Sequence, residues 1–209
     1  MHIVSEGYPF LLVGIFATVM CYMFISPVAA VVPLLLTLYF AFFFRNPTRP
    51  TPEDTSLLYS PADGTVTSIT EFHDDEYLNA DALKVTIFLS VFNVHVNRSP
   101  AAGEIKYQRY TCGHFLPAFD NSAPFENERL AIGMQKNQMK ILVIQIAGIL
   151  ARRIVSWVTL GHDLKQGECY GMIKFGSCTE LVVPKNVEIL CKKGQKVKGG
   201  VTVLGRIPQ

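Results

Sequence analysis

Charged residues are scarce in this chain. Lys, Arg, Asp and Glu make up 17% of the 209 residues, whereas apolar residues make up 49%. The formal net charge is only +2, and no basic stretch is interleaved with aromatic residues, so the sequence argues against nucleic-acid binding. A composition this apolar leans toward a protein with a membrane segment.

Cysteine is present, but not in a recognisable framework. The five cysteines are an odd number and include no C-x-x-C pair, which argues against a disulfide scaffold or a Cys-rich zinc site and favours a reducing compartment. His95 is followed by Val and Asn, whereas a zinc peptidase of similar β architecture needs an H-x-H pair. We therefore expect no metal.

Residues 7–44 contain no charged side chain, and a single membrane helix needs about 20 apolar residues. Ser26 and Pro27 divide the run, and Pro33 marks a second weak point. Two short crossings and a re-entrant hairpin both fit the two halves. A cleaved signal peptide does not fit, because residues 1–7 carry no Lys or Arg and a second apolar segment follows the first. A hairpin buried in a soluble core would be shorter.

Arg45 and Arg49 follow the apolar run directly. Because positive flanking residues stay on the cytoplasmic side, we expect attachment to the cell membrane with the remaining domain in the cytoplasm. A polar, Pro-rich stretch comes next and marks a domain boundary. The sequence thus predicts a membrane-anchoring hydrophobic hairpin over residues 1–45 and a second domain over residues 46–209.

Short runs rich in Val, Ile, Thr and Phe, separated by turn residues, dominate the second domain. They predict strands over residues 64–72, 82–96, 103–111, 139–148, 153–160, 172–184, 187–193 and 201–207. We expect helix only within 118–132 and 148–155. Segments 59–69 and 191–207 look like the half-motifs of the barrel-sandwich hybrid of lipoyl and biotinyl carriers. The predicted fold class is mainly β (α+β): a barrel-sandwich-hybrid-like β core with an N-terminal hydrophobic helical hairpin.

Three residues have the composition of a catalytic triad. Asp63 precedes Gly64, His95 lies in an apolar alternating stretch, and Ser177 follows Gly176 between two β-branched runs. Taken singly, they are explained as a turn Asp, a satisfied buried His and a glycine bulge. Taken together, they are an acid to orient the imidazole, a base and a hydroxyl nucleophile.

The ordered set of motifs resembles one family. "SPADG", "FNVHVNRSP", "ENER", "QIAGILARRIV" and "GMIKFGS" occur in the order and spacing of the short bacterial phosphatidylserine decarboxylase proenzymes, and "FFRNPTRP" is similar to the end of that family's membrane segment. The resemblance covers nearly the whole chain. It implies a pyruvoyl-dependent lyase of phospholipid biosynthesis, made as a zymogen, that converts phosphatidylserine to phosphatidylethanolamine.

The resemblance also implies roles for individual residues. The chain would cut itself between Gly176 and Ser177, and Ser177 would become the covalent pyruvoyl cofactor, with His95 and Asp63 driving the cleavage. Segments 1–176 and 177–209 would then stay together as a heterodimer. Asn127 and Arg129 of "ENER" are candidate substrate contacts, and Arg152 and Arg153 are either phosphate contacts or a solvated face.

This chain departs from the long-form enzymes of the family at two positions. Cys178 follows the serine where they have Thr, and Phe92 stands three residues before His95 where they have a second His. These departures bear on the decarboxylation step more than on cleavage.

Other interpretations remain open at this point. The expected partners are a phospholipid, the membrane and the chain's own two pieces, and homo-oligomerisation is left open. A decarboxylase of another serine-headed lipid, of the archaetidylserine type, fits equally well because only the head group reacts. A non-catalytic carrier is the weaker alternative. The lipoyl type needs a Lys at a hairpin tip, and the sugar-phosphotransferase type has no use for the membrane segment.

Overall fold

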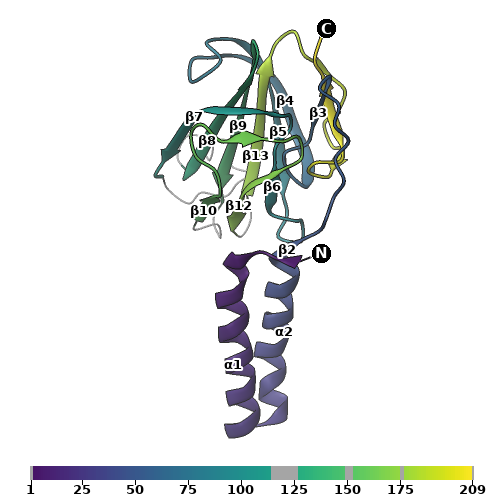
Figure 1. Ribbon diagram of the computed structural model, residues 1–209. Coiled ribbons are helices and arrows are strands. Elements are labelled where there is room, and N and C mark those ends of the chain that lie inside the picture. Colours follow the sequence, from purple (N-terminus) through teal and green to yellow (C-terminus); the bar gives the residue numbers. More distant parts are fainter. Residues whose placement is uncertain (1, 114–126, 149–152, 175–176, 209) are drawn as a thin grey trace. The chain divides into compact units, whose positions relative to one another are not determined.

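The computed structural model describes residues 2–113, 127–148, 153–174 and 177–208, without the side chain of Ser177. The chain divides into two compact units, Met1–Thr48 and Arg49–Gln209. The first unit is a helical hairpin of α1 (Tyr8–Phe24) and α2 (Pro27–Phe43) (Figure 1). A short 3-10 helix, Ser5–Gly7, precedes α1, and β1 (His2–Ile3) pairs antiparallel with β2 (Arg45–Asn46). The two ends of the hairpin therefore lie side by side.

Local chemistry explains the turn between the two helices. Ser26 caps α2 by accepting a hydrogen bond from the Ala29 backbone N–H, and Pro27 occupies the first helical position, where its missing N–H costs nothing. Both predicted halves are confirmed as helices. Pro33 does not end α2; the helix continues through it, and its carbonyl accepts a hydrogen bond from the Thr37 hydroxyl at 2.7 Å.

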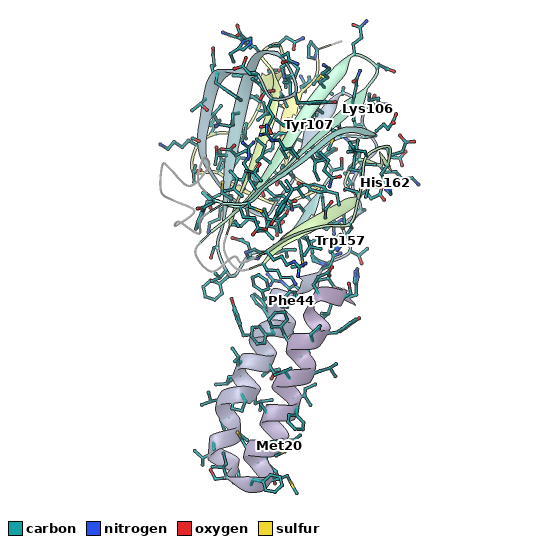
Figure 2. All side chains as sticks on the ribbon, turned by 90° about the vertical axis from the view of Figure 1, so that its left-hand side faces the viewer. Met20, Phe44, Lys106, Tyr107, Trp157 and His162 are labelled. Atoms are coloured by element: carbon teal, nitrogen blue, oxygen red, sulfur yellow. The ribbon has the colours of Figure 1, made fainter. Side chains whose placement is uncertain are left out.

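The hairpin buries very little of its apolar surface. No residue of α1 is buried, and Leu12, Val13 and Phe24 are 68%, 69% and 76% exposed. Figure 2 shows side chains, Met20 among them, projecting from both helices. Ser5–Phe24 is 20 residues long and apolar enough to cross a membrane, whereas Pro27–Phe43 is shorter.

The second unit is built from β-strands. They are β3 (Leu57–Tyr59), β4 (Gly64–Asp74), β5 (Ala80–Leu89), β6 (Val96–Arg98), β7 (Gly103–Thr111), β8 (Arg129–Lys136), β9 (Met139–Ala147), β10 (Arg153–Ser156), β11 (Asp163–Leu164), β12 (Cys169–Lys174), β13 (Ser177–Pro184), β14 (Glu188–Ile189), β15 (Lys196–Val197) and β16 (Val203–Arg206). A curled eight-stranded sheet has the order β11-β7-β8-β9-β13-β5-β4-β15 (Figure 1). Two three-stranded sheets, β10-β12-β6 and β14-β16-β3, complete the unit.

The eight-stranded sheet is apolar on both faces. Its inner face carries the main core, which includes Leu89, Val143 and Leu181, and its outer face carries a smaller cluster around Tyr77 and Cys178. In the outer cluster the Tyr77 and Tyr107 rings stack with centroids 5.4 Å apart. Strands buried on both faces are apolar almost throughout, as the run "ILVIQIA" in β9 is.

The predicted fold class is confirmed. Segments 59–69 and 191–207 do pair with each other: β3 with β16, and β4 with β15. The helix predictions are wrong where the structure tests them, since residues 129–132 lie in β8 and 153–155 in β10. Cross-strand pairing outweighed local helix propensity there. Residues 127, 128 and 148 are not helical either, and the remaining residues of those two predictions, 118–126 and 149–152, lie outside the described residues.

Candidate active site

Ser177 is the first residue of β13, in the interior of the eight-stranded sheet. Its Cα partners are Leu89 on β5 and Ala147 on β9. Both partners are completely buried in the main core. Gly176 lies outside the described residues. The residue on the carboxyl side of the predicted cut is therefore the first residue of a central strand.

His95 is tied to the segments on both sides of this position. The chain leaves β5 at Leu89, opposite Ser177, and turns between Ser90 and Asn93, where the Asn93 backbone N–H donates to the Ser90 carbonyl at 2.8 Å. His95 follows directly, and its own carbonyl accepts from the Ile173 N–H at 3.2 Å, on the strand that leads toward Ser177. The imidazole is completely buried.

The hydrogen bond of the imidazole fixes its tautomer. Nδ1 lies 3.0 Å from the backbone carbonyl oxygen of Asn93. A carbonyl can only accept, so Nδ1 carries the hydrogen and Nε2 carries the lone pair. His95 is thereby prepared to act as a base through Nε2.

Asp63 is bound to an arginine. Arg49 Nη1 and Nη2 lie 2.5 and 2.7 Å from the two carboxylate oxygens, and the Gly199 backbone N–H donates to Oδ1 at 2.8 Å. The side chains of Arg49 and Asp63 are only 11% and 10% exposed. Burial lowers the pKa of nearby Arg98, and the charge of Arg49 adds to this, whereas Asp63 opposes it. The hydrogen bonds to Arg49 and Gly199 hold Asp63 at the entry to β4. The group that orients the His95 imidazole is the Asn93 carbonyl.

A buried chain of polar side chains lies beside the Ser177 position. Asn97 Nδ2 donates to Thr179 Oγ1 at 3.0 Å and to the Pro61 carbonyl at 3.3 Å, and Gln145 Nε2 donates to Asn97 Oδ1 at 2.8 Å. Asn97, Gln145 and Thr179 are completely buried. Gln145 on β9 and Thr179 on β13 are Cα partners, and Thr179 is two positions after Ser177. These three residues are called the amide cluster below.

The "ENER" segment is divided between two faces of the sheet. Asn127 Nδ2 donates to the carbonyl of Ala147, the Cα partner of Ser177, at 2.7 Å. Arg129 instead pairs with Glu76 at 2.5 Å, next to Ala131 of the outer cluster. The structure thus places Asn127 next to Ala147, the partner of Ser177, and Arg129 on the other face of the sheet from Gln145. A substrate contact by either residue stays a prediction. Arg153 is exposed at the start of β10, and Arg152 lies outside the described residues.

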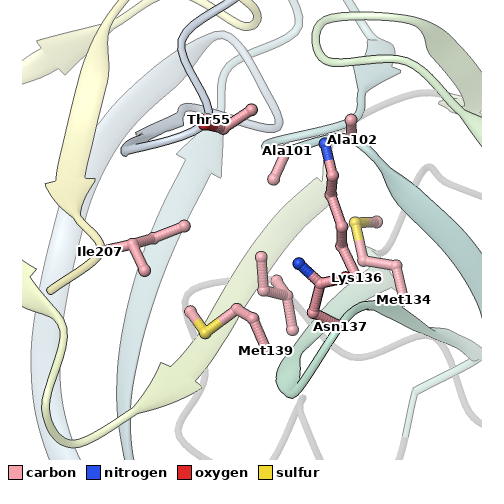
Figure 3. A pocket seen from close by; sticks show the side chains of 9 residues that line it. Thr55, Ala101, Ala102, Met134, Lys136, Asn137, Met139 and Ile207 are labelled. Carbon is pink, nitrogen blue, oxygen red and sulfur yellow. The ribbon is translucent and has the colours of Figure 1, made fainter. Parts of the chain in front are cut away.

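A cavity of about 400 Å³ lies elsewhere in this unit (Figure 3). Met134, Met139 and Ile207 line its apolar part, and Lys136 extends along its edge. It opens at the turn between β8 and β9, whereas Ala147 beside Ser177 is at the opposite end of β9. At about 3.4 Å per residue these ends are some 25 Å apart, so the cavity is separate from the cleavage position.

Residues 36–205 of the chain match the family described as phosphatidylserine decarboxylase. The chain belongs to this family. Phosphatidylserine decarboxylase proenzyme of Carboxydothermus hydrogenoformans is 53% identical over 174 residues, which cover 83% of this chain and 82% of that protein. The proenzyme of Symbiobacterium thermophilum is 43% identical over 209 residues, covering 99% of this chain and 96% of that protein.

Membership of the phosphatidylserine decarboxylase family confirms the resemblance drawn from the motifs, and the carrier interpretations gain no support. Sequence reasoning missed Arg49 and the three residues of the amide cluster, Asn97, Gln145 and Thr179. The sequence pattern places Arg49 only at the membrane flank, and it gives no role to Gln145, although Gln145 is the first residue of "QIAGILARRIV". The available signal for Gln145 was its position as the single polar residue within the apolar run "ILVIQIAG". The signal for Asn97 was its position two residues after His95, on the same side of an extended segment.

Proposed function

We propose that the chain is a proenzyme that cuts itself between Gly176 and Ser177 and then decarboxylates phosphatidylserine to phosphatidylethanolamine at a membrane surface. The observation that carries this proposal is the placement of His95. The base is tethered through Ile173 to the strand entering the cut and follows the turn that begins opposite Ser177. The names of the relatives support the same reaction and the same proenzyme form.

The cleavage chemistry needs only residues of this chain and one water molecule. His95 Nε2 takes the Ser177 hydroxyl proton, the oxygen attacks the Gly176 carbonyl carbon, and the C–N bond breaks as the nitrogen takes a proton, which leaves an ester. Removal of the α-proton of residue 177 then expels the Gly176 carboxylate. Water replaces the nitrogen, which leaves as ammonia, and residue 177 becomes the pyruvoyl group.

The surroundings fit such a group. The pyruvoyl group, once formed, supplies a carbonyl that captures an amine and accepts electrons as carbon dioxide leaves. The buried Cα partners Leu89 and Ala147 give it apolar neighbours, and the amide cluster provides polar atoms beside it. His95 is the proposed proton donor to the α-carbon of the substrate, since its Nε2 has already taken a proton once in the cleavage scheme.

The hairpin is the proposed membrane anchor of the enzyme. Its exposed apolar surface suits lipid, and the pairing of β1 with β2 suits an even number of crossings or a re-entrant turn. Arg45 bonds the Phe42 carbonyl at the end of α2 and marks the cytoplasmic flank. Arg49 bonds Asp63 in the second unit, so it adds less to that flank than the sequence suggested.

The test is to purify the protein in detergent and supply phosphatidylserine. We expect two chains, 1–176 and 177–209, a small chain that resists Edman sequencing, carbon dioxide release, and phosphatidylethanolamine as product. Borohydride should attach the lipid covalently to the small chain. Ser177→Ala should remain one chain and be inactive. A single intact chain with full activity would refute the proposal, and activity on other serine-headed lipids alone would refute only the lipid assignment.

A further inference from the structure

Gln145 has an unused acceptor inside the protein. The residue is completely buried, and its Oε1 atom has no hydrogen-bond partner within residues 2–113, 127–148, 153–174 and 177–208. Buried carbonyl oxygens are almost always paired, so this one indicates a donor other than the atoms of the chain that the structure describes.

The orientation of the Gln145 amide follows from its neighbours. The Pro61 carbonyl can only accept, so the NH₂ group of Asn97 must face it and Asn97 Oδ1 must face Gln145. Gln145 must then present its own NH₂ group to Asn97. Its oxygen is left over, and a missing partner must bring an N–H or an O–H.

The position of this oxygen limits the choice of donor. Gln145 pairs with Thr179, and Ala147 pairs with Ser177 two positions along the same strands. Diagonal neighbours of this kind in an antiparallel sheet are about 7–8 Å apart, within reach of a glutamine side chain. The reacting nitrogen in the proposed function is bonded to the α-carbon of residue 177.

We propose that Gln145 Oε1 accepts a hydrogen bond from the nitrogen held at residue 177. That nitrogen is the chain's own amine during self-cleavage and the primary amine of the lipid head group afterwards, because both bond to the same carbon. Asn97, fixed by Pro61, positions the Gln145 amide. The inference rests on the proposed function and adds to it the residue that recognises the amine.

The test measures two rates for Gln145→Met, which keeps the side-chain length and removes the acceptor. Self-cleavage is followed by cell-free synthesis with a pulse and chase, and borohydride trapping of phosphatidylserine is followed on the processed small chain. We expect both rates to fall about 10- to 100-fold, as for loss of a hydrogen bond to a charged donor. Gln108→Met is the matched control, since Gln108 bonds Ser156 and Val158 away from the amide cluster, and it should leave both rates unchanged.

A second variant distinguishes the loss of the hydrogen-bond acceptor at residue 145 from a change in the packing of its side chain. The protonated carboxyl of Gln145→Glu donates to Asn97 and keeps an acceptor oxygen, so both rates should recover as the pH falls, relative to wild type. Three results would overturn the inference. Gln145→Met could keep wild-type rates, or it could slow only one of self-cleavage and trapping. Gln145→Glu could also show no recovery of these rates as the pH falls. If the wild-type chain itself is neither cut nor trapped, the proposed function fails instead.

Discussion

Asp63 and Arg49 form a buried, two-pronged ion pair at the entry to β4, one strand away from the partner of Ser177. Removing one member of such a pair leaves an uncompensated buried charge and typically costs about 3–5 kcal/mol, whereas the pair itself contributes little. The effect of Asp63 on cleavage therefore has two possible sources, lost stability and lost positioning.

We expect His95→Ala to accumulate uncut chain and Asp63→Ala to do so less completely, because His95 is the proposed base whereas Asp63 bonds Arg49 and the Gly199 N–H at the entry to β4. Arg49→Ala should destabilise the protein as Asp63→Ala does, and the double variant should be less destabilised than the sum of the two. Denaturant unfolding and gel analysis of the cut measure both effects. Complete cleavage in a folded His95→Ala protein would remove His95 from this step.

Cys178, the neighbour of Ser177, packs as a small apolar side chain. It is 3% exposed in the outer cluster, and burial raises the pKa of its thiol, with the charge of Glu180 adding to the shift. The replacement of Thr by Cys after the serine thus adds no competing nucleophile.

Maleimide labelling at neutral pH should therefore modify exposed Cys112 in the folded protein and leave Cys178 unmodified until denaturant is added. Peptide mass spectrometry checks this site by site. Labelling of Cys178 as fast as Cys112 would contradict the burial of this strand.

At the scale of the strands, a row of backbone contacts runs through the cleavage position. A Cβ atom on Gly64 would lie 2.2 Å from the Phe88 carbonyl oxygen, so the close approach of β4 to β5 beside Leu89 requires glycine. Leu89 is in turn the partner of Ser177. Spreading β4 from β5 there displaces the strand against which the serine is placed.

Gly64→Ala should cost about 1–3 kcal/mol by crowding and should slow self-cleavage. Gly161→Ala is the matched control: its φ is +82 with open space around it, so the backbone strain costs about 1–2 kcal/mol without touching the site. The cleavage half-lives of the two variants are compared under conditions that give them the same free energy of unfolding. This separates the effect of lost stability from the effect of displacing β4 from β5. Equal half-lives would show that the row has no influence on the reaction.

Local pattern predicted β7 residue for residue and the start of β4, because alternation and turn glycines are properties of neighbouring residues. It failed at β8, where charges in "ENERL" suggested a helix and pairing with β7 and β9 imposed a strand. The site shows the same limit. His95 and Ser177 were recognisable by motif, whereas the bond of Gln145 to Asn97 joins residues 48 positions apart and depends on how strands assemble.

At the scale of the whole chain, the two compact units meet between Thr48 and Arg49, and the proposed function assigns anchoring to the first and catalysis to the second. A chain lacking residues 1–48 should leave the membrane fraction and still cut itself, because Arg49 remains to bind Asp63. A chain lacking residues 1–49 loses that partner and should be less stable and poorly cut. Membrane fractionation and gel analysis of the two truncated chains test these expectations. Retention of either truncated chain in the membrane fraction would contradict an anchoring role for the hairpin. External protease on intact cells should spare the second unit.

The proposed cleavage would leave a small chain whose strands are built into two sheets of the second unit. Segment 177–209 contributes β13, which lies between β9 and β5 in the eight-stranded sheet, and β16, which lies between β14 and β3. Leu181, Val182 and Val183 of β13 are completely buried in the two cores. The two chains should therefore co-purify without a disulfide and separate only in the denaturant range that unfolds the larger one. Size-exclusion chromatography across a urea series checks this. The small chain could instead be released while the large one keeps its β-sheet circular dichroism. That result would show that the packing of β13 stabilises the association far less than its burial implies.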